Sequence, residues 1–164
     1  MSDEPKRLMP SRKDIGRSAL FCVGELFSQF NKHSSDPQRI MGYKIPYWQR
    51  PLVWTEKQNI KFIESLWYEM PVGTYTFNRN HENDEFDDVL IDGQQRLNAL
   101  QLYSQNQYKV LGYYWAEVTP VDRRFFKQSQ FGCYISKHTS VECMKEHYNL
   151  LNFSGTSHKE DQYA

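Results

Sequence analysis

Apolar residues recur every three or four positions near the start of the chain, the spacing of an amphipathic helix. They are Ile15, Ala19, Cys22, Val23, Leu26, Phe27 and Phe30, so the pattern predicts a helix over residues 15–30. The polar segment 31–39 ends it. Residues 1–14 are polar and contain two prolines, and we expect a mobile N-terminal segment there.

A proline-rich aromatic segment, YKIPYWQRPLVW, follows at residues 43–54. Pro46 and Pro51 forbid a helix interior, so we expect a short strand and then an ordered loop carrying Gln49 and Arg50. Thr55 and Gln58 have the spacing of a capping box, which predicts a helix from 55 to about 70. Its expected apolar face is Ile60, Ile63, Leu66, Trp67 and Met70.

The middle of the chain alternates between strand and helix signals. The segment 74–77 is β-branched and aromatic and predicts a strand, and an acidic loop follows it. VLID, at 89–92, predicts a short buried strand, and a helix is expected directly after it at Gly93. Residues 108–118 predict one or two strands around Gly112.

The C-terminal third gives weaker local signals. Residues 123–127 and 131–135 are ambiguous between helix and strand. Thr139 and Glu142 form a second capping-box pattern, opening a helix whose apolar positions are Val141, Met144, Tyr148 and Leu151. Residues 152–164 are expected to be loop. This order of elements predicts a small α+β fold, a mixed sheet packed with helices, with residues 15–164 as one domain.

Length and charge narrow the class of protein. The chain has 164 residues and a mass of 19.6 kDa, which suits one domain with a real core. Twenty basic residues balance twenty acidic ones, which argues against a polybasic DNA binder that relies on bulk charge. Aromatic residues make up 15% of the chain, which argues against disorder.

Targeting signals are not evident in the sequence. No apolar run approaches the ~18–20 residues that span a bilayer, and the N-terminus has no signal-peptide pattern. The three cysteines include no CxxC pair. We therefore expect a cytoplasmic protein without a membrane partner.

The segment VLIDGQQRLNAL, at 89–100, is the best candidate for chemistry. A helix that starts at Gly93 directs its first unpaired N–H groups, those of Gln94, Gln95 and Arg96, toward an incoming anion. Arg96 adds a bidentate phosphate donor, and Asp92 suits Mg²⁺ or a positioned water. The alternative is that Asp92 only caps the helix and that Arg96 is solvated.

A second candidate lies in IPYWQR, residues 45–50. Gln49 and Arg50 stand in a loop bracketed by prolines, beside aromatic residues that include Trp54. Aromatic faces next to a guanidinium suit a nucleobase and its phosphates. A buried aromatic cluster with a stacked arginine is the structural alternative.

These two segments, with FIESL and MPVGTY between them, resemble the DGQQR-motif family over residues 43–104. Its members include the N-terminal domains of GmrSD-type modification-dependent restriction enzymes, and the resemblance implies a ParB/sulfiredoxin-like fold. The segment 148–162 looks like a later part of the family pattern, Asn-x-x-Gly, at Asn152 and Gly155, with His158 nearby. Two departures stand out, because Asn98 and Ala99 replace the usual threonines and the chain ends at Ala164 without an HNH nuclease domain. We expect a stand-alone version of the domain, whose nuclease activity is intrinsic, supplied in trans or absent.

What the resemblance implies is binding and hydrolysis of a nucleoside triphosphate with Mg²⁺, linked to DNA restriction or phage–host conflict. The implied catalytic residues are Asp92, Gln95 and Arg96, with Asp92 as the metal ligand. The implied nucleotide-binding residues are Gln49, Arg50, Trp54, Gly93, Gln94, Asn152 and His158. DNA or a partner nuclease is the expected macromolecular partner. A non-catalytic interaction module, in anti-restriction or as a decoy, and a ParB-like DNA nickase are the alternatives.

Three further clusters have other interpretations. Cys133, His138, Cys143 and His147 suggest zinc, although structural zinc sites favour closely spaced cysteine pairs. The acidic run at 82–88 is either a solvated loop, a metal site or a mimic of DNA phosphates. Lys109, Arg123, Arg124 and Lys127, interleaved with Phe125 and Phe126, form a short basic patch that suits nucleic acid.

Overall fold

A mixed six-stranded sheet runs through the centre of the molecule, in the strand order β1-β6-β4-β5-β3-β2. The computed structural model describes residues 9, 13 and 15–153. Its strands are β1 (Arg17–Ala19), β2 (Arg39–Ile40), β3 (Tyr43–Lys44), β4 (Tyr75–Asn78), β5 (Val89–Asp92) and β6 (Cys133–Ser136). The pairs β3–β5 and β4–β6 are parallel and the other pairs are antiparallel. The predicted α+β fold is confirmed.

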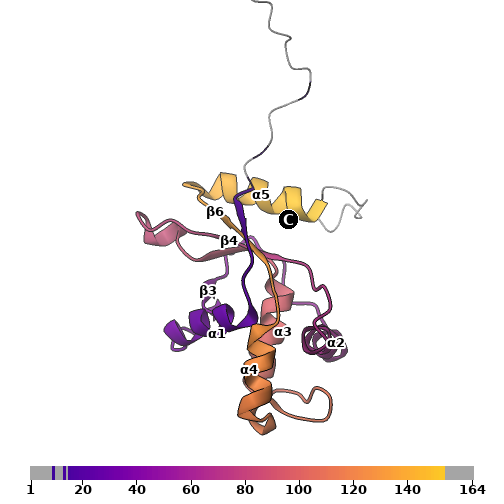
Figure 1. The fold of residues 1–164 in the computed structure, drawn as a ribbon. Coiled ribbons are helices and arrows are strands. Elements are labelled where there is room, and N and C mark those ends of the chain that lie inside the picture. The colour runs from indigo at the N-terminus through magenta and orange to yellow at the C-terminus, as the bar shows by residue number, and fades with distance from the viewer. Residues whose placement is uncertain (1–8, 10–12, 14, 154–164) are drawn as a thin grey trace, which may run out of the picture.

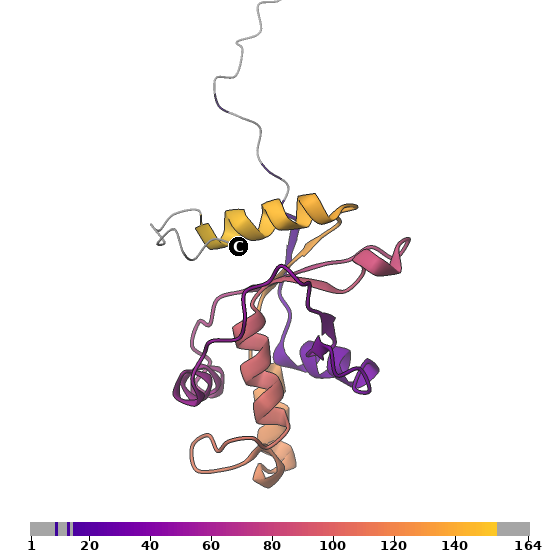
Figure 2. The ribbon, with the colours of Figure 1, turned by 180° about the vertical axis from the view of Figure 1, so that it is seen from behind.

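Helices cover both faces of this sheet. They are α1 (Val23–Lys32), α2 (Glu56–Trp67), α3 (Gln94–Ser104), α4 (Pro120–Gln128) and α5 (Val141–Phe153), with short 3₁₀ helices at Asp84–Phe86 and Trp115–Glu117. Figures 1 and 2 show α5 lying across one face, while the other four helices gather on the opposite face. None of the helices in the described part of the chain is long and apolar enough to cross a membrane.

Strand β5 belongs to two hydrophobic clusters at once. Val89 and Ile91 pack with Met144 and Tyr148 of α5, whereas Leu90 faces the larger core beneath α1–α4. Successive side chains of a strand point to opposite faces, so both faces of β5 need apolar residues. This position explains why the strand begins with three apolar residues in a row, Val89 to Ile91. The strand predicted at 89–92 is confirmed.

The helix predicted over 15–30 begins at Val23 instead, so its first part is wrong. Residues 17–19 form β1, which pairs antiparallel with β6, Arg17 lying opposite Ile135. Gly16 allows the chain to approach β6 closely just before β1, since its φ is +83° and a Cβ there would lie 2.3 Å from the carbonyl oxygen of Ile135. Long-range pairing overrides the helical period over these few residues.

The capping box at Thr55 is confirmed, because Thr55 Oγ1 accepts a hydrogen bond from the N–H of Gln58 at 3.3 Å. The helix ends at Trp67, however, and Met70 is exposed rather than part of the apolar face. Asn59 and Phe62 are buried on this helix alongside Ile63 and Leu66.

The strands predicted around Gly112 are wrong. Val110 and Tyr113 form one isolated bridge that closes a turn, and a 3₁₀ helix follows with Trp115 buried in the core. The ambiguous segment 123–127 lies in α4, which Thr119 caps by accepting the N–H of Asp122. The segment 131–135 leads into β6.

The last helix also differs from its prediction. Ser140, not Thr139, caps its start, since Ser140 Oγ accepts the N–H of Cys143 at 3.2 Å. The helix continues to Phe153, so residues 152–153 are helical rather than loop, and Leu151 is exposed. The mobility expected of residues 1–14 concerns a segment that, apart from Met9 and Lys13, lies outside the described residues.

Candidate functional site

A cleft of about 290 Å³ opens where β5 turns into α3, at the lower end of the range for ligand sites. Three segments line it: the loop after β3 (Gln49, Arg50, Trp54), the β5–α3 turn (Asp92, Gly93, Gln94, Gln95, Arg96) and the end of α5 (Tyr148, Leu151, Asn152, Phe153). The structure thus brings the predicted site residues from distant parts of the chain to one place. Gly155 and His158 lie outside the described residues.

The turn at Gly93 sets the geometry of the cleft. Gly93 is the N-cap of α3 with a φ of +99°, and a Cβ there would lie 2.7 Å from the Cβ of Tyr75. No side chain caps this helix end among the described residues. The N–H groups of its first turn are therefore left for a ligand, together with the positive end of the helix dipole.

Asp92 and Arg96 form an ion pair across this turn. Arg96 Nη2 donates to Asp92 Oδ2 at 3.0 Å, and the two side chains are about one-quarter exposed. On its far side the guanidinium lies against Gly73, where a Cβ would be 2.8 Å from Nη1. Asp92 therefore holds Arg96 at the cleft instead of capping the helix.

The carboxamide of Gln95 is engaged in holding the loop after β3. Its Oε1 accepts the N–H groups of Val53 and Trp54, and its Nε2 donates to the carbonyl of Pro51. Gln49 reaches in the opposite direction, donating from Nε2 to the carbonyls of Leu90 and Ile91 in β5. The roles in catalysis and nucleotide binding that the sequence suggests for these residues stay predictions.

Gln94 and Arg50 differ from their neighbours in having unsatisfied polar groups. Gln94 is only 9% exposed, and its buried Oε1 has no hydrogen-bond partner in the described part of the chain. A buried polar group without a partner costs about 1–3 kcal/mol. Arg50 is exposed and makes no hydrogen bond or ion pair with any described residue. The exposed guanidinium of Arg50 is therefore open to a ligand, whereas the Gln94 oxygen is buried beneath the lining of the cleft.

Aromatic and apolar side chains form the walls of the cleft. Trp54 packs against Phe62, with ring centroids 5.8 Å apart, and Tyr148 packs edge-on against Trp48 at 5.2 Å. The apolar spacing predicts a helix around Tyr148, but it does not place Tyr148, Leu151 or Phe153 at the site. An amphipathic pattern shows which face of a helix is apolar, but not which turn of it reaches another segment.

The departures from the family pattern lie away from the cleft. Neither Asn98 nor Ala99 lines it, and Ala99 is fully buried in the main core. A hydroxyl in place of the Ala99 methyl would face apolar neighbours rather than a ligand.

The zinc hypothesis gains no support. Cys133 lies in the core, Cys143 is exposed, and the two histidines contact each other, with His138 Nε2 and His147 Nδ1 3.0 Å apart. Within residues 9, 13 and 15–153, no group of three His, Cys, Asp or Glu side chains is arranged to hold a metal ion.

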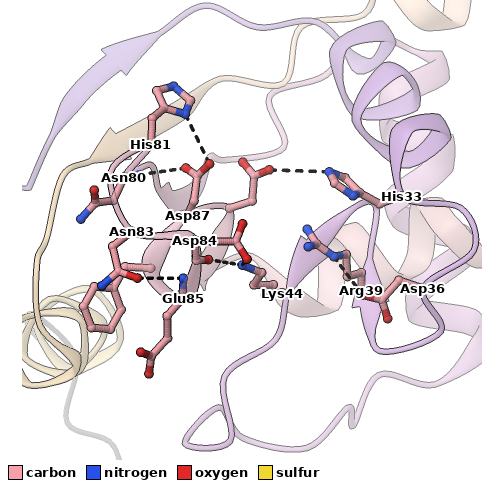
Figure 3. Close-up of polar contacts among 12 residues, drawn as sticks. His33, Asp36, Arg39, Lys44, Asn80, His81, Asn83, Asp84, Glu85 and Asp87 are labelled. Carbon is pink, nitrogen blue, oxygen red and sulfur yellow. Dashed lines mark hydrogen bonds and ion pairs between the residues drawn. The ribbon is translucent and has the colours of Figure 1, made fainter.

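The acidic loop is organised by contacts with cationic and imidazole groups (Figure 3). Asp87 lies 3.3 Å from His81, Asp88 lies 3.7 Å from His33, and Asp84 contacts Lys44. These contacts tie the loop to α1 and β3 and favour the interpretation of a structured surface loop.

The basic patch is largely engaged in internal contacts. The guanidinium of Arg123 lies 5.2 Å from the ring of Trp115 and donates to two backbone carbonyls beside it. Lys127 lies over Phe27, and Lys109 lies over Tyr114. Arg124 and Phe125 are exposed, so the surface open to nucleic acid is small.

The fold and the cleft define an α+β protein in which an uncapped helix N-terminus and two arginines meet at one site. The chain matches the family model described as GmrSD restriction endonuclease, N-terminal domain, over residues 23–163. The protein belongs to this family, as the resemblance predicted. Comparison with curated proteins and with solved structures gave no match. The ParB/sulfiredoxin-like classification therefore stays a prediction.

Proposed function

We propose that the cleft binds the phosphates of a nucleoside triphosphate and that the protein hydrolyses it. The family is that of a restriction-enzyme domain, so we place this activity in DNA restriction or phage–host conflict. One observation carries the proposal: the uncapped N-terminus of α3 and the guanidinium groups of Arg50 and Arg96 line the same cleft. Helix N-termini and arginines are the groups that proteins use for phosphate.

The charged groups of the cleft and the open end of α3 each have a role in this proposal. The N–H groups of the first turn of α3 donate to phosphate oxygens, as does Arg50, which has no competing partner among the described residues. When the ligand binds, Arg96 releases Asp92 and bonds to a phosphate instead. The Asp92 carboxylate is then left for a water or a metal ion. The Oε1 of Gln94 can only accept a hydrogen bond, so it suits a hydroxyl or amino group of the nucleotide rather than a phosphate oxygen.

The residues of the cleft fit Mg²⁺ only as an ion carried by the nucleotide. Asp92 is the one carboxylate among the described lining residues, and Mg²⁺ is commonly held by one or two carboxylates together with the phosphates of its substrate. Such an ion would neutralise charge on the phosphates. The Asp92 side chain would hold it once Arg96 has turned to the ligand.

The expected partners follow from the family. We propose that DNA or a separate nuclease is the macromolecular target and that the protein acts in a bacterial or infected-host cytoplasm. The three cysteines, none of which is disulfide-bonded, are compatible with that compartment.

A second function is binding without hydrolysis, as a nucleotide-dependent interaction module. It is favoured by the present contacts of two groups, because Asp92 is paired with Arg96 and the Gln95 carboxamide is bonded to the loop. Neither is then free to position an attacking water.

The test measures phosphate release from ATP, GTP, CTP and UTP with Mg²⁺, with and without DNA. We expect turnover by the wild type and a loss of at least a hundredfold in Arg96→Ala, since a phosphate-clamping arginine is worth several kcal/mol in the transition state. Arg124→Ala, which removes an exposed arginine of α4, is the matched control and should retain turnover.

The outcomes separate the candidate functions. Full turnover in Arg96→Ala contradicts the proposed hydrolase. Nucleotide-dependent thermal stabilisation without turnover, lost in Arg96→Ala, identifies a binding module. Nicking of supercoiled plasmid with Mg²⁺ or Mn²⁺ and no nucleotide would identify a ParB-like nickase instead.

A further inference from the structure

The loop that carries Arg50 is fastened to the sheet and to α3 by side-chain amides. Gln95 holds its second half: Oε1 accepts from Val53 at 3.0 Å and from Trp54 at 3.1 Å, and Nε2 donates to the Pro51 carbonyl at 3.1 Å. Gln95 is only 6% exposed, and the three bonds are partly buried. Both polar atoms of this carboxamide bond to the loop, through three hydrogen bonds.

Gln49 holds the first half of the same loop. The pairing of β3 with β5 is limited to the register Lys44–Val89. Beyond it, the Gln49 amide donates to the carbonyls of Leu90 at 2.9 Å and Ile91 at 3.0 Å. Its two N–H groups thus extend the contact with β5 where backbone pairing has ended.

Arg50 lies between these two anchors in the chain. Gln49 precedes it and Pro51, whose carbonyl Gln95 binds, follows it. Arg50 itself is exposed and contacts no described residue through a hydrogen bond or ion pair. The backbone of Arg50 is therefore fixed on both sides while its guanidinium stays open to the cleft.

We propose that Gln49 and Gln95 are positioning residues, which together clamp the Arg50 loop over the N-terminus of α3. The inference rests on the proposed phosphate site. Fixing the loop before the ligand arrives lowers the conformational entropy lost on binding, so a preorganised Arg50 binds phosphate more tightly than a mobile one. In this arrangement neither glutamine touches the ligand.

The first experiment measures the clamp itself, without ligand. In the wild type the N–H groups of Val53 and Trp54 are hydrogen-bonded to Gln95, and amide exchange followed by NMR should show both protected. Gln95→Leu should increase their exchange at least tenfold. Gln49→Leu, at a half-buried position, provides the second variant if Gln95→Leu does not fold, as judged by circular dichroism.

The second experiment measures the affinity for inorganic tripolyphosphate by calorimetry. We expect Arg50→Gln to weaken binding at least tenfold and Gln95→Leu to weaken it by a similar factor. Because Gln95 acts through Arg50, the two losses should not multiply. The double variant Arg50→Gln/Gln95→Leu should have an affinity within threefold of that of whichever single variant binds less tightly. Arg96 is held by α3 and Asp92 and not by the loop. In the control pair, Arg96→Gln and Gln95→Leu, the two fold-losses of affinity should therefore multiply.

The results test the positioning role of the glutamines separately from the proposed phosphate site. Multiplied effects of Gln95→Leu and Arg50→Gln would show that Gln95 acts on the ligand directly, which overturns the inference, as would unchanged exchange at Val53 and Trp54. A wild type that does not bind tripolyphosphate refutes the proposed function. In that case lost protection in Gln95→Leu still supports the clamp, and retained protection overturns it.

Discussion

At the scale of single residues, Gly93 is the position in the cleft where a side chain is poorly tolerated. Its φ of +99° is strained for any other residue, and a Cβ would lie 2.7 Å from that of Tyr75. We expect Gly93→Ala to lower the free energy of unfolding by about 2–4 kcal/mol, from the backbone strain and the clash together. Urea denaturation measures this loss.

Gly112→Ala separates these two causes. Gly112 has a similar φ of +90°, but a Cβ there would meet nothing within 4 Å. Only backbone strain remains, so the loss should be about 1–2 kcal/mol. Equal losses in the two variants would show that Tyr75 moves aside freely.

The Asp92–Arg96 pair gives a second prediction at this scale. On the proposed function, Asp92 competes with phosphate for Arg96, and its charge also repels the phosphate. Asp92→Asn should therefore strengthen binding of tripolyphosphate in EDTA by about three- to tenfold. In Mg²⁺ the gain should disappear, because the carboxylate that would hold the ion is gone. Calorimetry in the two buffers measures both effects.

Asp84→Asn is the matched control for that charge change. Asp84 is fully exposed in the acidic loop, outside the lining of the cleft, and its removal should leave the affinity unchanged within about twofold. An increase in both variants would assign the effect to overall charge rather than to release of Arg96.

At the scale of elements, α5 is attached to the sheet by a small hydrophobic cluster. Met144, 2% exposed, packs there with Val89, Ile91 and Tyr148. Met144→Ala should lower the free energy of unfolding by about 2–4 kcal/mol, because it leaves a cavity between the helix and β5. Cys143→Ala, at the neighbouring exposed position, should change it by less than about 0.5 kcal/mol in the same denaturation experiment.

The elements predicted from sequence are those with a local signal. The capping box at Thr55 and the apolar run before Gly93 each specify an element within a few residues. β1 has three residues and exists because β6 pairs with it, which no local pattern shows. Residues 108–118 have strand-forming side chains, but the Asn106 side chain and the burial of Trp115 fix a turn and a 3₁₀ helix there.

The candidate site was predictable to a similar extent. The segments at 49–54 and 92–96 were assigned to it from turn chemistry and family resemblance, and the structure brings them together. The contribution of Tyr148 and Phe153 depends on how α5 crosses the sheet, which is a property of the packed molecule. Likewise, only the contacts of Gln95 show that its carboxamide holds the loop.

At the scale of the whole molecule, the protein should lose stability in alkali. Burial raises the pKa of the Cys133 thiol from 9.0 to about 11, and burial also raises the pKa of Tyr43 and of Tyr75 above the ordinary 10.0. The folded state thus keeps these protons after the unfolded state has released them. Stability is full below pH 9 and falls as the pH rises toward 11 and beyond; up to pH 11 the loss is about 2 kcal/mol from the thiol and about 1 kcal/mol from each tyrosine.

Urea denaturation at a series of pH values from 8 to 11 tests this. Cys133→Ala should flatten the fall between pH 9 and 10, where the thiol titrates first, and leave the steeper fall above pH 10 that the tyrosines cause. A wild-type stability that does not change over this range would contradict the prediction.

The bonds of Gln95 have a consequence for comparing homologues of this protein. A relative without the proposed hydrolysis would still need this glutamine to shape its loop, because three of the loop's backbone groups bond to it. Finding the second glutamine of a DGQQR sequence is then evidence of a retained loop, not of turnover. Arg50 bonds to no described residue, so on the proposed function only phosphate binding constrains its side chain. We expect it to be the first of these positions to change in a lineage that no longer binds phosphate.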